Sequence, residues 1–161
     1  MNLSTGAANA FWNGGLCPVT PSGPPYAGLT YGVLDLFSGP MPTDPNNADS
    51  GTLLARITVA SGAWVAGTST NGLEFSPPAG GIVGIKSGQV WSGLGVAEGT
   101  IGYARFRGNV LDAGGSSTSL VRVDLTVSAG GGAEVNVSTL NVKVGVPVPI
   151  SAVTLTMPRS S

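Results

Sequence analysis

Apolar and polar residues alternate along short segments from residue 31 onward, a period typical of half-buried β-strands. Residues 119–128 show it most clearly, because Arg122, Asp124 and Thr126 lie between Val121, Val123, Leu125 and Val127. We therefore expect one face of this strand to point to the core and the charged face to point to solvent. The same period predicts further strands at residues 31–38, 52–59, 63–66, 73–76, 81–85, 89–91, 100–107, 133–138 and 150–157.

Turn-forming segments separate these strands. Residues 39–50 form a long polar turn, Gly130–Gly132 indicates a hairpin turn, and residues 144–149 carry two prolines, which suit an edge or a link. Roughly eight to ten short strands at regular spacing predict an all-β domain, as a β-sandwich or jelly-roll-like fold. A small closed barrel is the alternative architecture.

The first thirty residues have a different pattern. Residues 2–13 predict a short helix, with Ser4 as its N-cap, and residues 17–30 contain four prolines, which favour an extended arm. The helix either covers one end of its own domain or docks on a neighbouring subunit. We therefore divide the chain into the helix and Pro-rich arm at residues 1–30, the β domain at 31–158 and a C-terminal tail at 159–161.

Composition fits one β domain with many turns. The 161 residues include 26 Gly and 12 Pro, 42% are hydrophobic and only 9% are charged, with a formal net charge of −1. Disordered chains usually combine low hydrophobicity with high charge, which is the opposite pattern. So little charge favours a surface that lies against a partner, although a polar Ser/Thr/Asn surface on a β protein gives a similar composition.

Several functions are disfavoured by missing residue types. The chain has no His and a single Cys, Cys17, so it has no histidine for a catalytic triad or metal site and no internal disulfide. The seven basic residues are scattered, unlike a nucleic-acid-binding patch. No signal peptide and no apolar run long enough to span a membrane is evident. We expect a protein that is not an enzyme and binds no cofactor, nucleic acid or membrane.

Some residues nevertheless suggest candidate chemistry. Asp44, Asp49 and Asn46-Asn47 share one loop and could bind calcium, although turn chemistry explains them more simply. Glu74 and Glu98 could form a carboxylate pair for glycoside hydrolysis, but no pattern places them together. Trp64 or Trp91 could stack on a carbohydrate, against a role for both in the core or an interface.

Arg105 and Arg107 project from the same face of one predicted strand, opposite Phe106. They could meet acidic groups of a neighbour or cover the edge of their own sheet. No catalytic, cofactor-binding or metal-binding residue is predicted. The predicted interface residues are Leu3, Phe11, Trp12, Tyr26, Trp64, Trp91, Arg105 and Arg107.

Four segments in order carry a resemblance that spans nearly the whole chain. They are residues 1–7, residues 36–39 followed by Pro42, Ala48 and residues 51–55, residues 102–106, and residues 150–158. Together they resemble a group of small virion proteins of tailed bacteriophages. The chain departs from that pattern at residues 13–30, which look like an insertion.

The resemblance implies a structural component of the virion, made in the host cytoplasm. Within that class it implies a capsid decoration or cement protein, which would bind the major capsid protein on the outer surface of the phage head at capsomer junctions. Such proteins are commonly trimers or dimers, so a homo-oligomer is expected. The alternative is a tail, collar or fibre-attachment adaptor of the same kind of particle.

Overall fold

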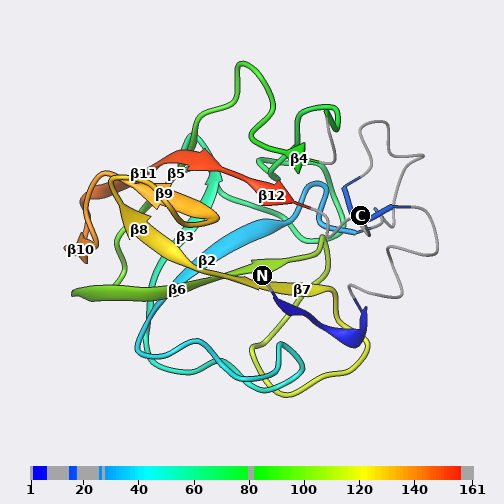
Figure 1. Cartoon of the computed structure of the whole chain (residues 1–161), viewed down its shortest axis with the longest axis horizontal. Coiled ribbons are helices and arrows are strands. Elements are labelled where there is room, and N and C mark those ends of the chain that lie inside the picture. Colours follow the sequence, from blue (N-terminus) through cyan, green and yellow to red (C-terminus); the bar gives the residue numbers. More distant parts are fainter. Residues whose placement is uncertain (1, 7–14, 18–25, 27, 80–81, 157–161) are drawn as a thin grey trace.

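The computed structural model describes residues 2–6, 15–17, 26, 28–79 and 82–156 (Figure 1). Within these residues the named elements are strands, and Thr5 and Gly6 have helical backbone. The strands are β1 Asn2–Leu3, β2 Val33–Ser38, β3 Leu53–Val59, β4 Ile82–Val83, β5 Trp91–Leu94, β6 Gly99–Arg107, β7 Arg122–Leu125, β8 Val127–Ala129, β9 Val135–Val137, β10 Asn141–Val142, β11 Pro147–Val153 and β12 Leu155–Thr156.

One sheet with the order β1-β7-β6-β2-β3-β5-β11-β9-β8 makes up most of the fold, with β10 added to β6. Strands β7 and β8 are consecutive in the chain and are separated only by Thr126. Because β7 pairs with β6 and β8 pairs with β9, this one stretch of chain nearly closes the sheet on itself. The all-β prediction is confirmed, and the nearly closed sheet corresponds to the small-barrel alternative.

The apolar core fills the inside of this sheet. Its largest side chains include Trp91 and Phe106, whose rings meet edge to face with their centroids 5.8 Å apart. Irregular pairing in two strands changes the simple alternation. Leu36 pairs with Ala55 and Phe37 with Leu53, so Leu54 is an extra residue and enters the core beside Ala55.

A second packed layer covers the outer face of β2, β6 and β7. Figure 1 shows the 39–52 and 108–121 loops on the same side of these strands. The Phe37 ring stacks on the Tyr103 ring with centroids 5.1 Å apart, and the Tyr103 hydroxyl donates to the Ser50 carbonyl at 3.1 Å. A Cβ on Gly51 would lie 1.8 Å from the Ser38 carbonyl oxygen, and its φ of +72° also requires glycine. The 39–52 loop therefore packs backbone to backbone on the sheet.

Several predicted strands are corrected by the pairing. Residues 63–66 form no strand, and residues 73–76 make only isolated bridges. Of the segment expected at 89–91, only Trp91 belongs to a strand, β5. The long 119–128 strand divides at Thr126, and its Arg122 and Asp124, expected to face solvent, are buried because two loops cover them. Strand β10 was not predicted. Strand β11 begins within the proline segment. Pro147 and Pro149 lack an amide hydrogen, and they are tolerated because β11 pairs with β5 alone at these positions.

The glycine run is not a hairpin turn. Gly130–Gly132, all with positive φ, connects β8 to β9, and these two strands are parallel. A hairpin would make them antiparallel. The chain instead loops back far enough for β9 to run in the same direction as β8.

The helix prediction for the N-terminus is corrected only at its first residues, since Thr5 and Gly6 have helical backbone. Asn2–Leu3 is a strand on the edge of β7, and Ser4 Oγ donates to the Leu120 carbonyl and accepts from the Arg122 amide. Most of the helix predicted for residues 2–13 lies outside the described residues, as do residues 159–161 of the predicted tail. Leu16 and Leu29 belong to the core.

Candidate functional site

Charges of alternating sign form a row across the outer face of four neighbouring strands. Arg56 on β3 is the register partner of Asp35 on β2, which is also the partner of Arg105 on β6. Arg105 in turn pairs with Asp124 on β7. Opposite charges directly across a sheet attract one another. The sequence therefore places a charge pattern on this face that only strand pairing brings into line.

The side chains in this row form short ion pairs. Asp35 accepts from Arg56 Nε at 2.7 Å and from Arg107 Nε at 2.7 Å, so one carboxylate links two guanidinium groups. Arg105 donates from Nε and Nη2 to the two carboxylate oxygens of Asp124, at 2.6 and 2.8 Å. This fork-to-fork geometry is the strongest form of an arginine–carboxylate contact.

Two loop aspartates complete the arrangement. Asp49, from the 39–52 loop, accepts from Arg105 Nη1 at 3.0 Å and from Arg107 Nη2 at 2.5 Å. Asp112, from the 108–121 loop, accepts from Arg122 Nε and Nη2 at 2.7 and 2.6 Å and lies 2.5 Å from Arg107 Nη1. The ion pairs therefore tie both loops to the sheet.

We call these eight residues the ion network: Arg56, Arg105, Arg107, Arg122, Asp35, Asp49, Asp112 and Asp124. They are eight of the fifteen charged residues of the sequence, four of each sign. The Arg105 and Asp124 side chains are fully buried, at 0% exposure. A buried charge is tolerated only when it is paired and hydrogen-bonded, which holds for both.

Electrostatics within the network keep Asp112 and Arg107 ionised. Burial alone raises the pKa of Asp112, but hydrogen bonds from Arg122 and the Gly114 amide, with the charge of Arg107, outweigh it and hold that pKa at about 2. Burial lowers the pKa of the Arg107 guanidinium, while Asp35, Asp112 and Asp49 together raise it above its ordinary value. Groups held in one charge state fasten the structure and do not exchange protons near neutral pH.

Beside the network, the 108–121 loop presents apolar side chains to solvent. Leu111 is 81% exposed, and Val110 and Val65 are also exposed. The backbone holds them together, because the Gly67 amide donates to the Asn109 carbonyl at 3.0 Å and Asn109 Nδ2 donates to the Thr68 carbonyl at 2.8 Å. We call Val65, Val110 and Leu111 the Leu111 surface.

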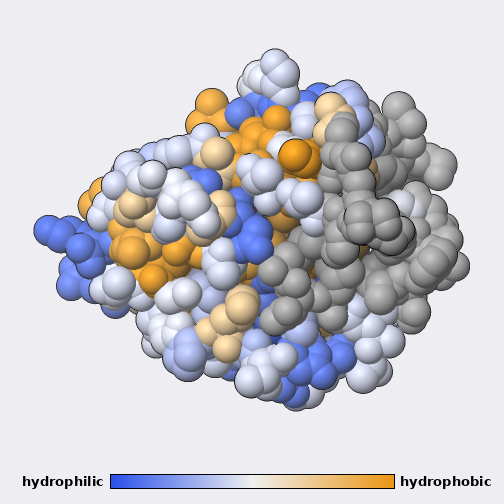
Figure 2. Space-filling model, viewed as in Figure 1, coloured by the Kyte–Doolittle hydropathy of each residue, from blue (hydrophilic) through white to orange (hydrophobic). Residues whose placement is uncertain are grey.

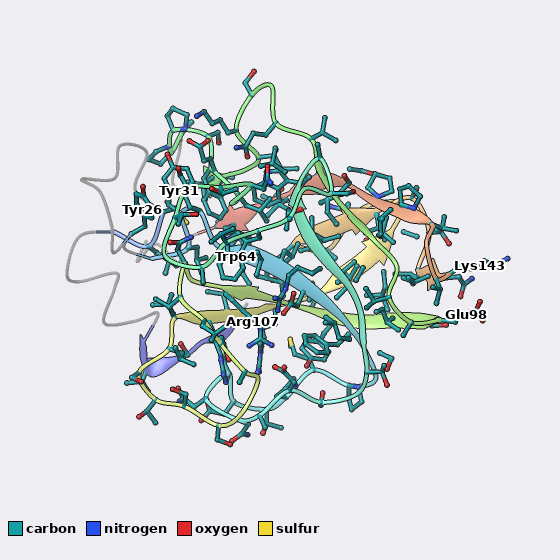
Figure 3. The ribbon with its side chains drawn as sticks, turned by 180° about the vertical axis from the view of Figure 1, so that it is seen from behind. Tyr26, Tyr31, Trp64, Glu98, Arg107 and Lys143 are labelled. Carbon is teal, nitrogen blue, oxygen red and sulfur yellow. The ribbon has the colours of Figure 1, made fainter. Side chains whose placement is uncertain are left out.

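An aromatic group lies next to this surface. Trp64 Nε1 donates to the Tyr31 carbonyl at 2.8 Å. The Tyr26 and Tyr31 rings meet edge to face, with their centroids 4.6 Å apart (Figure 3). Tyr31 has a φ of +58°, which is uncommon for a bulky residue. Its carbonyl accepts from both Trp64 and Asn109, and these bonds compensate for the unfavourable backbone conformation.

The structure divides the predicted interface residues into three groups. Trp91, Arg105 and Arg107 are buried within the chain, so the prediction that they contact a partner is corrected: the core encloses Trp91, and the loops cover the two arginines. Tyr26 and Trp64 are half-buried and lie in one region. For Leu3 the structure describes only the backbone, while Phe11 and Trp12 lie outside the described residues.

The other candidate residues are also placed by the structure. Asp44 performs turn chemistry, since its Oδ1 accepts from the Asn46 amide at 2.8 Å. Glu74 binds Lys86 Nζ at 2.6 Å and interacts with Tyr31, whereas Glu98 lies at the opposite end of the molecule, so they form no carboxylate pair (Figure 3). Burial raises the pKa of Cys17 to about 12, which disfavours a reactive thiolate.

Sequence reasoning did not identify the ion network or the Leu111 surface. The signal available for the network was opposite charge at alternate positions of predicted strands, as in Arg122 and Asp124. Within the described residues, no cluster of three or more potential metal ligands is found, and no helix is long and apolar enough to cross a bilayer.

Comparison with known proteins adds no relative: no family model, no curated protein and no solved structure matches this chain.

Proposed function

We propose that this protein is a structural component of a bacteriophage virion, and within it a decoration or cement protein on the outer surface of the head. In this role it binds the major capsid protein and stabilises the junctions between capsomers. The four ordered segments that resemble small virion proteins support the class. The observation that carries the proposal is how little charge the described surface presents.

The ion network is the cause of that low surface charge. It buries most of the arginine charge of the chain against aspartates, and Lys86 pairs with Glu74 outside it. A partner that covers the remaining surface therefore has few unpaired charges to desolvate, and desolvating an unpaired charge is expensive. Cores of protein interfaces are depleted in charge for the same reason.

The Leu111 surface is the proposed contact with the shell. A side chain as large as leucine at 81% exposure is an apolar group available to a partner. Asp112, the next residue, is fixed by Arg107 and Arg122, so the loop is ordered before binding. A contact that is already ordered costs less conformational entropy on association.

Labelling of purified particles tests the class of function. Immunogold with an antibody against the full chain is expected to decorate the whole head, with hundreds of copies per particle. Label restricted to one vertex or to the tail would replace the proposal with the adaptor alternative. Particles that carry no label would overturn the virion role.

A surface variant tests the proposed contact. Heads that lack the protein are mixed with the purified full chain, and bound protein is measured after sedimentation. We expect Leu111→Ser to weaken binding by at least about tenfold, the range of an apolar hot spot. Val90→Ser is the matched control, because Val90 is also well exposed but lies in a different loop. Equal binding by both variants would reject the Leu111 surface as the shell contact.

A further inference from the structure

A second apolar surface lies where the 94–98 segment meets the 143–147 turn. Leu94, Val96, Val144 and Val146 each expose 49–60% of their surface. We call these four residues the valine tip. Leu94 ends β5, and Val96 lies in the bend that follows buried Gly95.

The backbone holds the two halves of the valine tip together. The Gly95 amide donates to the Val146 carbonyl at 3.0 Å, and the Gly145 amide donates to the Gly95 carbonyl at 2.8 Å. The Val146 amide donates back to the Lys143 carbonyl at 3.2 Å, which closes a tight turn with Gly145 at a φ of +74°. That turn places Val144 at its outer corner. The apolar side chains are therefore presented by an ordered scaffold.

Two charges of opposite sign lie together at one end of the valine tip, because Glu98 and Lys143 lie directly beyond the Gly99–Val142 pair at the end of the β6–β10 ladder. Glu98 follows Val96 by two residues, and Lys143 begins the turn that carries Val144. Both side chains are exposed, and among the described charged residues they are, with Asp44, the ones that form no ion pair. Figure 3 places both at the end of the molecule far from Tyr26 and Tyr31.

Nearly every other charge in the described part of the chain has a partner within the chain, so these two stand out. On the face shown in Figure 2, a hydrophilic end adjoins hydrophobic side chains over β8, β9 and β11. An apolar patch bordered by one positive and one negative side chain is complementary to itself. A partner with charges of a single sign would satisfy only one of the two.

We propose that the valine tip binds a second copy of this chain around a twofold axis. In that arrangement the valines and Leu94 of the two copies pack together, and Glu98 of each copy pairs with Lys143 of the other. A twofold contact uses the same residues on both sides, so each contact occurs twice. The proposal does not depend on the virion role.

The small size of the valine tip sets the expected affinity. Stable dimers bury about 800 Å² on each partner, and small contacts bind weakly. We expect a Kd between about 10 μM and 1 mM in solution. Such a contact becomes effective when many copies are held side by side, because the local concentration is then high.

Charge reversal tests the reciprocal pairing. E98K places Lys against Lys143 twice in a symmetric dimer, and K143E places Glu against Glu98 twice. Each variant alone is expected to self-associate about tenfold more weakly than the wild type, as measured by sedimentation equilibrium. An equimolar mixture of the two variants restores opposite charges at both contacts, so it is expected to associate with near wild-type affinity.

Two further variants complete the test. V144S is expected to weaken association without a change of charge. D44K makes the same charge change as E98K at an exposed site outside the tip and is expected to leave association unchanged. Circular dichroism confirms that each variant is folded. The proposal is overturned if the wild type stays monomeric up to about 1 mM, if D44K weakens association as much as E98K, or if the mixture associates no better than each variant alone.

Discussion

The ion network and the valine tip use charge in opposite ways. In the network, charged side chains of the strands meet two aspartates from the covering loops, and each is bound by at least one partner of opposite sign in the same chain. At the tip, Glu98 and Lys143 are exposed, are unpaired and border exposed apolar residues. Charge in this protein therefore either fastens the fold or remains free for a partner. Substitutions in the two regions should therefore have very different effects on stability.

The largest expected effect is the loss of Arg105. R105M leaves the fully buried Asp124 carboxylate without its guanidinium partner and removes one of the two bonds to Asp49. Breaking one side of a buried ion pair costs about 3–5 kcal/mol. Urea denaturation is expected to show a fall of that size in the free energy of unfolding.

The double variant R105M/D124L separates the lost pairing from the lost volume. Both charges are then replaced by apolar side chains, so no unpaired buried carboxylate remains, and we expect much of the lost stability to return. A double variant as unstable as R105M would show that Arg105 acts mainly through Asp49 and the Asn47 carbonyl.

An intermediate effect is expected from acid. The folded-state pKa of Asp112 is about 2, below its ordinary value of 3.8, so folding favours the ionised carboxylate. Its contribution is complete above the unfolded pKa and is lost as the pH falls from about 5 to 2, a total of about 2 kcal/mol. Unfolding free energies measured across this range should fall less steeply in D112N. Identical slopes in the two proteins would contradict a fastening role for Asp112.

The smallest effect is expected at the valine tip. V144S changes an exposed side chain that fills no cavity, so the free energy of unfolding of the monomer should change by less than about 0.5 kcal/mol. Thermal unfolding of dilute protein measures this. A loss of several kcal/mol would show that Val144 supports the fold, and the contrast between the two regions would then disappear.

Strand positions were largely predictable because alternation reports them directly. The segments 31–38, 52–59 and 100–107 contain β2, β3 and β6, and these strands form the centre of the sheet. Leu34 and Leu36 share one side of β2 and lie in the core, as does Phe106, on the side of β6 opposite Arg105 and Arg107. Alternation failed at Leu54, since a change of register between neighbouring strands leaves no mark in either strand alone.

The candidate sites were less predictable than the strands. Arg105 was singled out as a possible partner contact because an arginine on the outer face of a strand looks exposed. Its carboxylate partners, Asp49 and Asp124, come from a loop and from a different strand. Nothing in the sequence predicted that Leu111 is exposed, because a single leucine in a loop is expected to pack inward.

The sequence alone was enough for the all-β class, the low charge and the residues that share a side of the central strands β2 and β6. Only the tertiary structure decided that β7 and β8 nearly close the sheet, and that two loops fold over the charged face. The physical reason is that alternation records the side of a strand on which a residue lies. Whether water or another part of the chain covers that side depends on contacts between residues far apart in the sequence.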